Sequence, residues 1–457
     1  MASRILILGG GFAGLTAART LERILRPEEA DIVLVSRENY SLFTPMLPEV
    51  GSGNLETRHV VTPVRAQLKR SAFVLADVCE IDLESKTVEV EHTIMGAHQT
   101  LAYDHLVFAL GAVTSTFDLP GIADRSIPYK TLEDADRLRN HVIAMLELAD
   151  VTSDPAERKR LLRFVFVGGG FTGVEAAGEM ADFFRSTRRF YKSIGPEEIE
   201  IVLVEGGKKL LPELQAGMGE YSAKALTRRG VRVMTQAMVA GADERGLHLK
   251  NGETIETSTI VWSAGVKPSP VVAKLSIGSG RGGSIVVNRD FSVPDFPGVW
   301  AIGDCASIPD GHGSTYPPTA QHAIREAPVL AHNIAATLRG RPTKEFNYVA
   351  FGMMASLGAR RGVAGLQGRF LITGFLAWAL WRTYYLARLP GIDRRLRVSF
   401  DWTLGLLFPR DIAELRVYSS FAQLRAQLDA GLESAARGDE AKAHEEVEAA
   451  EKALTEA

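Results

Sequence analysis

Short apolar runs alternate with longer amphipathic stretches over the first 340 residues, and this alternation predicts parallel strands connected by helices. Two of the apolar runs, residues 4–8 and 164–167, each lead into a glycine-rich turn and an Ala-rich helical stretch. A second apolar run, at 31–35 and 199–205, completes each βαβ unit. Further strands are expected at 86–90, 103–111, 262–265 and 299–302, helices at 131–150 and 317–340, and a loop at 39–65.

The character of the chain changes at residue 370, from which aromatic and basic residues predominate up to 408. Twelve uncharged residues separate Arg369 from Arg382, too few to cross a bilayer, which takes about 20. Aromatic side chains recur there at helical spacing and arginines follow, as expected for a helix in a membrane interface. The residues are Phe375, Trp378, Trp381, Tyr384 and Tyr385, then Arg388, Arg394, Arg395 and Arg397, with a second apolar element at 402–408.

The alternative for this region is a helix packed on its own domain or in a dimer interface. The last thirty or so residues are rich in Ala and Glu and carry no strand pattern. They are predicted to form a solvated helix or a frayed tail.

Composition narrows the function without identifying it. The 457 residues carry a formal net charge of −3, which gives no reason to expect a nucleic-acid partner. Cys79 and Cys305 are far apart, so neither a disulfide framework nor a Cys-rich metal site is expected, and no metal is predicted. The first strand begins at Arg4, which leaves no room for a signal peptide and predicts a cytoplasm-facing protein.

Both glycine-rich turns have the G-x-G-x-x-G spacing of dinucleotide-binding folds. Such a turn lets the backbone approach a pyrophosphate, while the following helix presents free N–H groups and a positive dipole end. Two copies about 160 residues apart predict two dinucleotides on one protein, with electrons moving between them. The first cradle comprises Gly9, Gly10, Gly11, Phe12, Ala13 and Gly14, and the second comprises Gly168, Gly169, Gly170, Phe171, Thr172 and Gly173.

The residue at the end of the second strand of each unit indicates how a ribose is held. Glu205 has this position in the second unit, where a carboxylate bonds ribose hydroxyls and repels a 2′-phosphate, favouring NADH over NADPH. Two lysines at 208–209 make that preference moderate. The first unit has Ser36, followed by Arg37 and Glu38, and either Ser36 or Glu38 is expected to meet the ribose.

The motifs resemble those of a known group of flavoproteins. Gly303-Asp304-Cys305-Ala306 resembles the second FAD motif of two-dinucleotide-binding flavoproteins, and Ala264-Gly265-Val266 with Pro268 resembles the segment that closes on NADH. Pro317-Pro318-Thr319-Ala320-Gln321-His322-Ala323 resembles the flavin-side quinone motif of type II NADH:quinone oxidoreductases. Residues 39–45, 401–402 and 408–411 are also similar to that family, and the resemblance covers roughly residues 4 to 415.

The resemblance implies that hydride passes from NADH to FAD and that two electrons then reduce a membrane quinone, without proton pumping. FAD would occupy the first cradle and NADH the second, with Asp304 contacting the ribityl chain. The family often has a second glutamine where this chain has His322, which either faces the quinone or only packs. Other expected cofactor contacts are Ser36, Arg37, Thr44, Pro45, Gly111, Glu205, Ala264, Gly265, Ala320 and Gln321.

Two residues are expected to act at the reacting groups. Pro318 is expected to start a helix, so that the N–H groups of Ala320 and Gln321 point at the flavin edge where negative charge develops. The resemblance also places Gln321 beside the quinone.

Glu175 lies just inside the helix after the second cradle, and the matching family residue lies between nicotinamide and flavin, which implies positioning and proton delivery. The simpler interpretation is a carboxylate at a helix N-terminus. Cys305 is expected to be a buried packing residue.

The predicted architecture is α/β, with two Rossmann-like dinucleotide-binding domains and a C-terminal membrane-associating helical region. Two other functions stay open: reduction of a soluble carrier such as a ferredoxin, and an NADH-sensing role similar to that of apoptosis-inducing factors. A homodimer through the C-terminal helices is a further hypothesis. The expected divisions are 1–115 and 286–345 for FAD binding, 116–160 for a connecting segment, 161–285 for NADH binding, 346–420 for membrane association and 421–457 for the tail.

Overall fold

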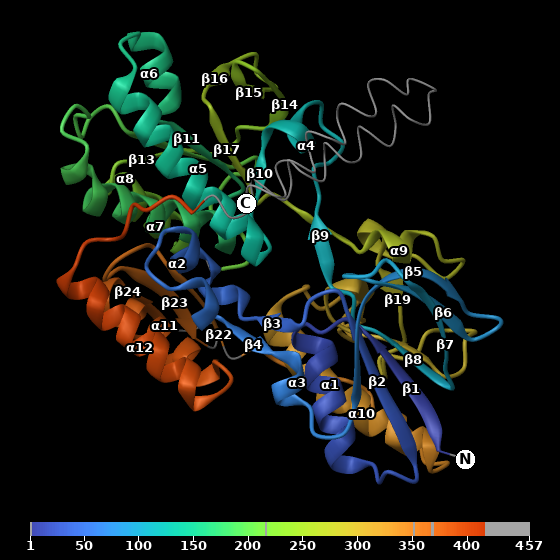
Figure 1. The fold of residues 1–457 in the computed structure, drawn as a ribbon. Coiled ribbons are helices and arrows are strands. Elements are labelled where there is room, and N and C mark those ends of the chain that lie inside the picture. The colour runs from blue at the N-terminus through green and yellow to red at the C-terminus, as the bar shows by residue number, and fades with distance from the viewer. Residues whose placement is uncertain (1, 215–216, 351, 367–369, 416–457) are drawn as a thin grey trace, which may run out of the picture.

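The computed structural model describes residues 2–214, 217–350, 352–366 and 370–415. Figure 1 shows two α/β lobes, with the C-terminal helices and a small sheet lying against them. The predicted tail at 421–457 lies outside the described residues. The α/β class and the two dinucleotide-type lobes are as predicted.

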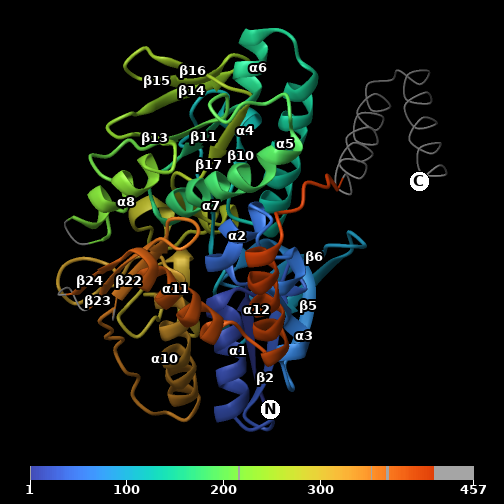
Figure 2. The same ribbon diagram turned by 90° about the vertical axis from the view of Figure 1, so that its left-hand side faces the viewer.

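The first lobe is built on a seven-stranded sheet in the order β20-β8-β1-β2-β5-β6-β7. Its core strands pair in parallel, and residues 5–8 of β1 are fully buried, as expected for a strand covered on both faces. Helices α1 and α10 lie side by side against this sheet (Figures 1 and 2). The elements are β1 Ser3–Leu8, α1 Phe12–Ile24, β2 Ala30–Ser36, β5 Ala72–Asp82, β6 Thr87–His92, β7 His98–Ala102, β8 His105–Phe108, β20 Val299–Ala301 and α10 Ala320–Leu338.

The second lobe has a five-stranded parallel sheet in the order β10-β17-β11-β12-β13. Helix α7 follows β11 directly and completes the second predicted βαβ unit with β12. Thr131 and Asp134 form a capping box at the start of α5, which explains where that predicted helix begins. The elements are β10 Ile127–Pro128, α5 Leu132–Val151, α6 Pro155–Leu161, β11 Arg163–Val167, α7 Phe171–Thr187, β12 Glu200–Val204, α8 Met218–Thr227, β13 Val231–Met234 and β17 Thr259–Trp262.

Two short strands, β9 Ala112–Thr114 and β18 Val266–Pro268, pair antiparallel where the chain passes between the lobes. The smaller elements are α4 Ile122–Arg125, α9 Pro270–Ala273, β19 Ile285–Val286 and β21 Ala306–Ser307, with a three-stranded sheet of β14 Val239–Asp243, β15 Gly246–Leu249 and β16 Thr254–Glu256.

The predicted loop at 39–65 contains more regular structure than expected. Pro45 and Pro48 each occupy the first turn of a short helix, where the missing N–H removes no helical hydrogen bond. Pro45 and Pro48 therefore lie at the starts of short helices, where the sequence analysis expected only a loop. The elements are β3 Tyr40–Leu42, a 3₁₀ turn Thr44–Met46, α2 Leu47–Gly51, a 3₁₀ turn Thr57–His59, β4 Val61–Pro63 and α3 Val64–Gln67.

The C-terminal region contains the expected helices and, before them, a small sheet that the sequence analysis did not predict. Strands β22 Gly352–Ser356, β23 Gly362–Leu366 and β24 Phe370–Thr373 form an antiparallel sheet. Helix α11, Gly374–Arg388, begins only after β24, at a glycine with φ +71°, and α12 spans Ile392–Leu407. Among the described residues, no helix has both the length and the apolar character needed to cross a membrane.

Candidate functional site

Close backbone packing requires glycine in both cradles. A Cβ on Gly14 would lie 1.9 Å from the carbonyl oxygen of Gly9, and the second cradle repeats this contact between Gly173 and Gly168 at the same distance. A Cβ on Gly11, by contrast, would meet no heavy atom within 4 Å, and the same holds for the matching glycine of the second cradle. In each cradle the backbone therefore packs tightly on itself at the last glycine and faces open space at the third, which suits the close approach of a pyrophosphate.

The helices that follow the cradles begin with free donors. Neither α1 nor α7 has a side-chain cap or an acidic residue in its first turn. Their first N–H groups and positive dipole ends are therefore left for an anion. The predicted contacts Phe12, Ala13, Phe171 and Thr172 all lie in these first turns. The chemistry of both sites fits the pyrophosphate of a dinucleotide.

The two strand ends differ as the sequence suggests. Glu205 lies beside the second cradle, where its Oε2 accepts the N–H of Gly169 at 2.6 Å and its Oε1 accepts the N–H of Gly207 at 2.5 Å. Ser36 lies under the first cradle, since a Cβ on Gly10 would come within 2.8 Å of its Oγ. Each residue thus lies beside its cradle, and the ribose contact stays a prediction. Arg37 points away into an exposed ion pair with Glu38, at 3.8 Å.

The aspartate motif follows β20 in the first lobe. Asp304 lies 3.9 Å from the Nζ of Lys130, and burial raises the pKa of its carboxyl. Behind it, the Oε2 of Glu326 accepts the N–H of Gly303 at 2.7 Å and holds the turn. Cys305 is fully buried, and burial raises the pKa of its thiol to about 12. It therefore stays protonated at neutral pH, in agreement with the expected packing role.

Helix α10 presents its N-terminus at the predicted quinone motif, with one correction. Thr319 is the N-cap, its Oγ1 accepting the N–H of His322 at 3.4 Å, so Pro318 precedes the cap instead of starting the helix. A threonine hydroxyl can accept a free helical N–H and a proline side chain cannot, which explains why Thr319 and not Pro318 caps the helix. Ala320 and Gln321 are the first two helical residues, and the Nε2 of Gln321 donates to the hydroxyl of Tyr348 at 2.8 Å.

His322 is a buried side chain enclosed by its neighbours. Its Nδ1 lies 2.7 Å from the Oγ1 of Thr319, and its ring packs on the rings of Tyr316 and Tyr348. Burial lowers the pKa of the imidazole, so the neutral form prevails at neutral pH. These contacts account for the packing interpretation, and a quinone contact stays a prediction.

Glu175 is buried in the second turn of α7, with 7% of its surface exposed. Its Oε1 accepts two hydrogen bonds from the C-terminal region, from the N–H of Ser356 at 2.8 Å and from the Nε1 of Trp381 at 2.9 Å. Burial raises its pKa to about 8, although both donors oppose the rise. The group is therefore mostly protonated at neutral pH, unlike the ionised carboxylate at a helix N-terminus of the simpler interpretation.

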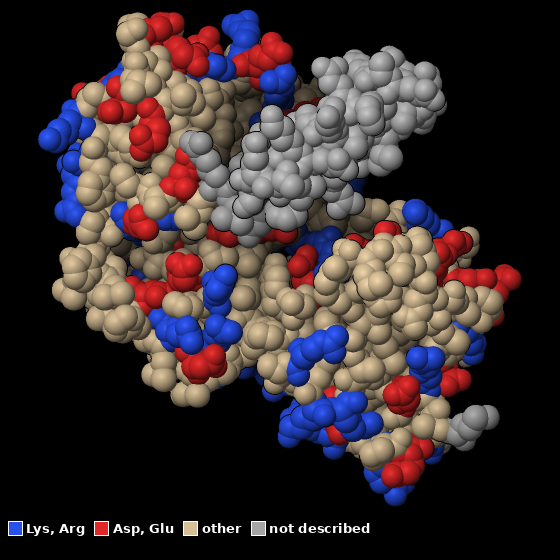
Figure 3. Space-filling model, in the orientation of Figure 1, with Lys and Arg blue, Asp and Glu red and all other residues tan. Residues whose placement is uncertain are grey.

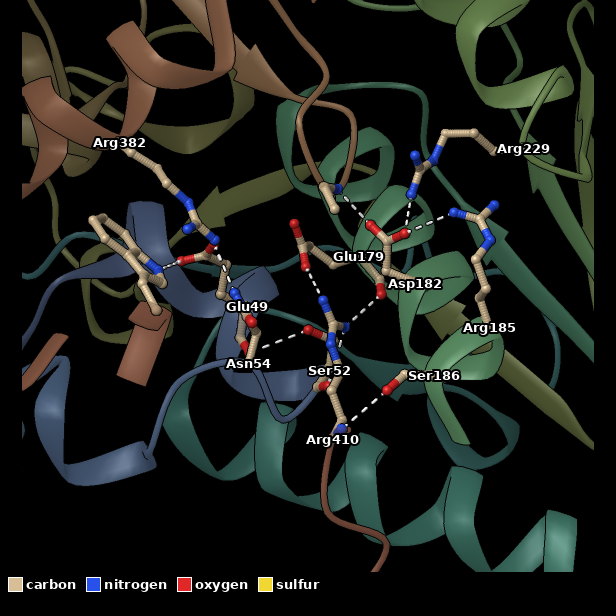
Figure 4. A network of polar contacts seen from close by, with 12 residues as sticks. Glu49, Ser52, Asn54, Glu179, Asp182, Arg185, Ser186, Arg229, Arg382 and Arg410 are labelled. Atoms are coloured by element: carbon tan, nitrogen blue, oxygen red, sulfur yellow. Dashed lines mark hydrogen bonds and ion pairs between the residues drawn. The ribbon is translucent and has the colours of Figure 1, made fainter. Parts of the chain in front are cut away.

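Two further acids continue along the same face of α7, as Figure 4 shows. The Oε2 of Glu179 is 2.8 Å from the Nη2 of Arg410, which also donates through Nη1 to the carbonyl oxygen of Glu179 at 2.8 Å. Asp182 pairs with Arg229, both side chains being more than nine-tenths buried. Residues after α12 are thus fastened to α7 by buried charges.

A third buried pair joins α2 to the two C-terminal helices. Glu49 has 1% of its surface exposed and bonds the Nη2 of Arg382 on α11 at 3.0 Å and the Nε1 of Trp402 on α12 at 2.8 Å. The guanidinium of Arg382 lies between two indole rings, 4.3 Å from the centroid of Trp378 and 4.4 Å from that of Trp402. The pattern of aromatic residues predicted a membrane-facing row, whereas Trp381 and Trp402 face inward.

Sequence reasoning missed Glu49, Glu179, Arg410 and the inward role of Trp381. One signal was available, because acids at 175, 179 and 182 share a face of a helix that is otherwise apolar. A buried charge of this kind requires a partner. Apart from Arg185, which pairs with Asp182, the partners are more than 40 residues away in sequence, so the pattern does not identify them.

The exposed surface of the C-terminal region carries a row of apolar side chains, here termed the foot. On α12 the row repeats every three or four residues and forms an exposed, largely apolar stripe. Its members on β24, α11 and α12 and directly after α12 are Phe370, Leu371, Phe375, Leu376, Ile392, Leu396, Phe400, Leu404, Leu406, Leu407 and Phe408.

A groove of about 410 Å³ runs along α1 between the first cradle and the end of α11. Its lining includes Gly11 and Phe12 of the first cradle, Ile324 of α10, and Arg388 and Pro390 at the end of α11. Charged side chains of α1 also line it, namely Arg19, Glu22 and Arg23. Figure 3 shows Lys and Arg side chains gathered over α1 and α3 on this side of the molecule.

Comparisons with known proteins agree with this geometry. Residues 3–327 match the family described as pyridine nucleotide-disulphide oxidoreductase, and residues 351–411 match the NDH2 C-terminal domain. The type II NADH:quinone oxidoreductase Ndh of Mycobacterium tuberculosis is 32% identical, covering 96% of each chain. That of Staphylococcus aureus is 31% identical over 80% of this chain and 90% of its own. The fold of NDH2 from Plasmodium falciparum in complex with NADH superimposes with a TM-score of 0.83 at 22% identity, over 90% of this chain and all of that one.

Proposed function

The chain belongs to the type II NADH:quinone oxidoreductase family, and from this premise we propose that its quinone approaches the first cradle through the groove along α1. The activity is the family's: non-electrogenic, FAD-dependent oxidation of NADH by quinone. When bound, FAD supplies the redox chemistry, accepting hydride from NADH and passing two electrons to the quinone.

The lining of the groove is the observation that supports the proposal. The same groove is lined by Gly11 and Phe12 of the first cradle and by Arg388 and Pro390, where α11 gives way to α12 and its exposed apolar row. Phe12, Leu15 and Ile324 form an apolar part of its lining that suits an isoprenoid chain. The remaining lining is largely polar and includes Arg19, Glu22 and Arg23. A lipid-soluble molecule could therefore pass from the foot to the first cradle.

Two elements of the chain would act on the reacting groups. The N-terminus of α10, with free N–H groups at Ala320 and Gln321, stabilises negative charge at the edge it faces. Glu175 holds a proton at neutral pH, and a quinone that accepts two electrons also takes up two protons. We assign Gln321 to quinone positioning and Glu175 to proton supply.

Membrane association would be peripheral, through the foot. Exposed leucine and phenylalanine side chains on α12 favour insertion into the headgroup region, and nearby arginines favour anionic lipids. We further propose that the protein faces the cytoplasm, with a homodimer as a further hypothesis. We also propose that the FAD-binding, NADH-binding and membrane-associating regions have the boundaries expected from the sequence.

The proposal is tested by separating the two half-reactions of the purified flavin-loaded protein. Gln321→Ala should slow reoxidation of the reduced protein by a short-chain quinone, while reduction by NADH stays within about twofold of wild type. Gln99→Ala, on the exposed strand β7, is the matched control and should change neither. Equal losses in both half-reactions would refute the position assigned to Gln321, and turnover with ferredoxin but not quinone would refute the function.

A further inference from the structure

Helix α11 presents two tryptophans to different surroundings. Trp381 has 1% of its surface exposed, and its Nε1 donates to the Oε1 of Glu175 at 2.9 Å. Trp378, one turn earlier, is half-buried, and its Nε1 has no hydrogen-bond partner among the described residues. The two indoles thus form a natural pair: Trp381 donates to Glu175, whereas Trp378 stacks on the guanidinium of Arg382, a contact that a phenylalanine ring also makes.

The carboxyl of Glu175 is held unevenly by its two donors. Both the N–H of Ser356 and the Nε1 of Trp381 bond Oε1, and neither bonds Oε2. An oxygen that accepts two N–H bonds is a poor place for a proton, so the neutral group carries its proton on Oε2. The donors therefore decide which oxygen bears the proton and where that proton points.

Ser356 alone would leave the carboxyl freer to turn. Its backbone N–H comes from β22, which is pressed against α7 so closely that a Cβ on Gly178 would lie 2.7 Å from the carbonyl carbon of Leu357. This contact fixes the position of β22. A single hydrogen bond from Ser356 still leaves the carboxyl group of Glu175 free to rotate about the bond that joins it to the side chain. The indole supplies the second point and is itself wedged against Tyr385, with ring centroids 4.9 Å apart.

We propose that Trp381 is a positioning residue for quinone reduction, holding Glu175 so that its proton stays on Oε2. This proposal rests on the proposed function of Glu175. The other titratable groups near the carboxyl are Glu179 on α7, Glu49 on α2 and Tyr385 on α11. Trp381 packs on Tyr385, and Trp381→Phe keeps an aromatic ring in that contact.

The test compares Trp381→Phe with the matched control Trp378→Phe in full-length, flavin-loaded protein. Stopped-flow mixing of NADH-reduced protein with a short-chain quinone measures the oxidative half-reaction between pH 6 and 10. Trp381→Phe should slow this step about tenfold and move its alkaline midpoint upward by about one pH unit, because a donor to the ionised carboxyl is lost. Flavin reduction by NADH should stay within about twofold, and Trp378→Phe should change neither quantity.

A replacement of Trp381 by 3-benzothienylalanine, in which sulfur takes the place of the indole N–H, removes the donor while keeping the ring. It should reproduce the effects of Trp381→Phe, and a wild-type rate and midpoint would overturn the proposal whether or not Trp381→Phe folds. A merely structural role would instead slow both half-reactions at an unchanged midpoint.

The double variant Glu175→Gln/Trp381→Phe separates the role proposed for Trp381 from the role proposed for Glu175. If Trp381 acts through Glu175, adding Trp381→Phe to Glu175→Gln should cause no further loss. A full additional loss would overturn the positioning role while leaving the proposed function intact. An oxidative half-reaction unaffected by Glu175→Gln would instead remove the role proposed for Glu175 itself.

Discussion

Replacing Arg410 by methionine should weaken the attachment of the C-terminal region in a manner that depends on pH. The Arg410 side chain is 10% exposed and that of Glu179 is 2% exposed, so the substitution leaves a buried carboxyl without its partner. Breaking a buried ion pair from one side destabilises by about 3–5 kcal/mol. Arg410 also donates to the carbonyl oxygens of Ser52 and Glu179, at 3.2 and 2.8 Å, and those bonds are lost as well.

The pH dependence follows from Glu179. Burial raises its pKa to about 7, and Arg410 keeps it lower than burial alone would. Because the folded chain binds this proton more tightly, the stability it contributes is fully present below the unfolded pKa of 4.5 and is lost as the pH rises through 7. A rise of this size corresponds to about 3 kcal/mol. Without Arg410 the pKa rises further, so the penalty should be small at pH 5 and largest above pH 8.

Urea unfolding, followed by tryptophan fluorescence at pH 5.5 and 8.5, measures this difference, since Trp381 and Trp402 report on the C-terminal helices. Arg397→Met, at an exposed arginine of α12, is the control and should be nearly neutral at both pH values. The double variant Glu179→Leu/Arg410→Met should recover the part of the loss that comes from the unpaired carboxyl, because neither charge of this pair is then buried. An Arg410→Met protein with the same deficit at both pH values would refute the reasoning.

Three further predictions concern the cradles and the foot. Gly11→Val is compatible with the backbone, since φ at Gly11 is −76° and no heavy atom lies within 4 Å of the added Cβ. The side chain would occupy the space expected for the pyrophosphate. The purified protein should therefore fold but retain little flavin, as measured by absorbance. Glu205→Ala removes the charge that repels a 2′-phosphate, so the preference for NADH over NADPH in kcat/KM should fall about tenfold. Leu407→Glu should reduce binding to anionic vesicles about tenfold in a sedimentation assay, whereas Ile94→Glu, equally exposed but distant from the foot, should not.

The parts of the fold that could be predicted from sequence depend on local patterns. An apolar run followed by G-x-G-x-x-G specifies a strand, a tight turn and a helix within about 20 residues, and both cradles formed as expected. The start of α10 was misplaced by two residues, because proline and threonine both favour helix N-termini and only the structure shows which one caps. Such errors are small, since the competing signals are themselves local.

The inward or outward orientation of the C-terminal aromatic residues could not be predicted. Trp378 and Trp381 are three residues apart in the same aromatic run, yet only Trp381 reaches a buried carboxylate, at residue 175. On α12 the stripe Ile392, Leu396 and Phe400 has the spacing of a core-facing helix, but it is the exposed face. Periodicity reveals that a helix has an apolar face, and tertiary contacts decide whether that face meets protein or solvent.

The contacts of α7 make the C-terminal region part of the site wall instead of an appended anchor. Glu175, Glu179 and Glu49 are all buried, and each depends on a donor that follows residue 350: an indole or amide, Arg410, and Arg382 with Trp402. Three buried carboxyls without these donors would carry a large desolvation penalty in the folded chain. Part of the proposed membrane-contacting surface and the indole that donates to Glu175 therefore lie on the same helix, α11. A displacement of α11 would change the surroundings of Glu175 directly, through Trp381.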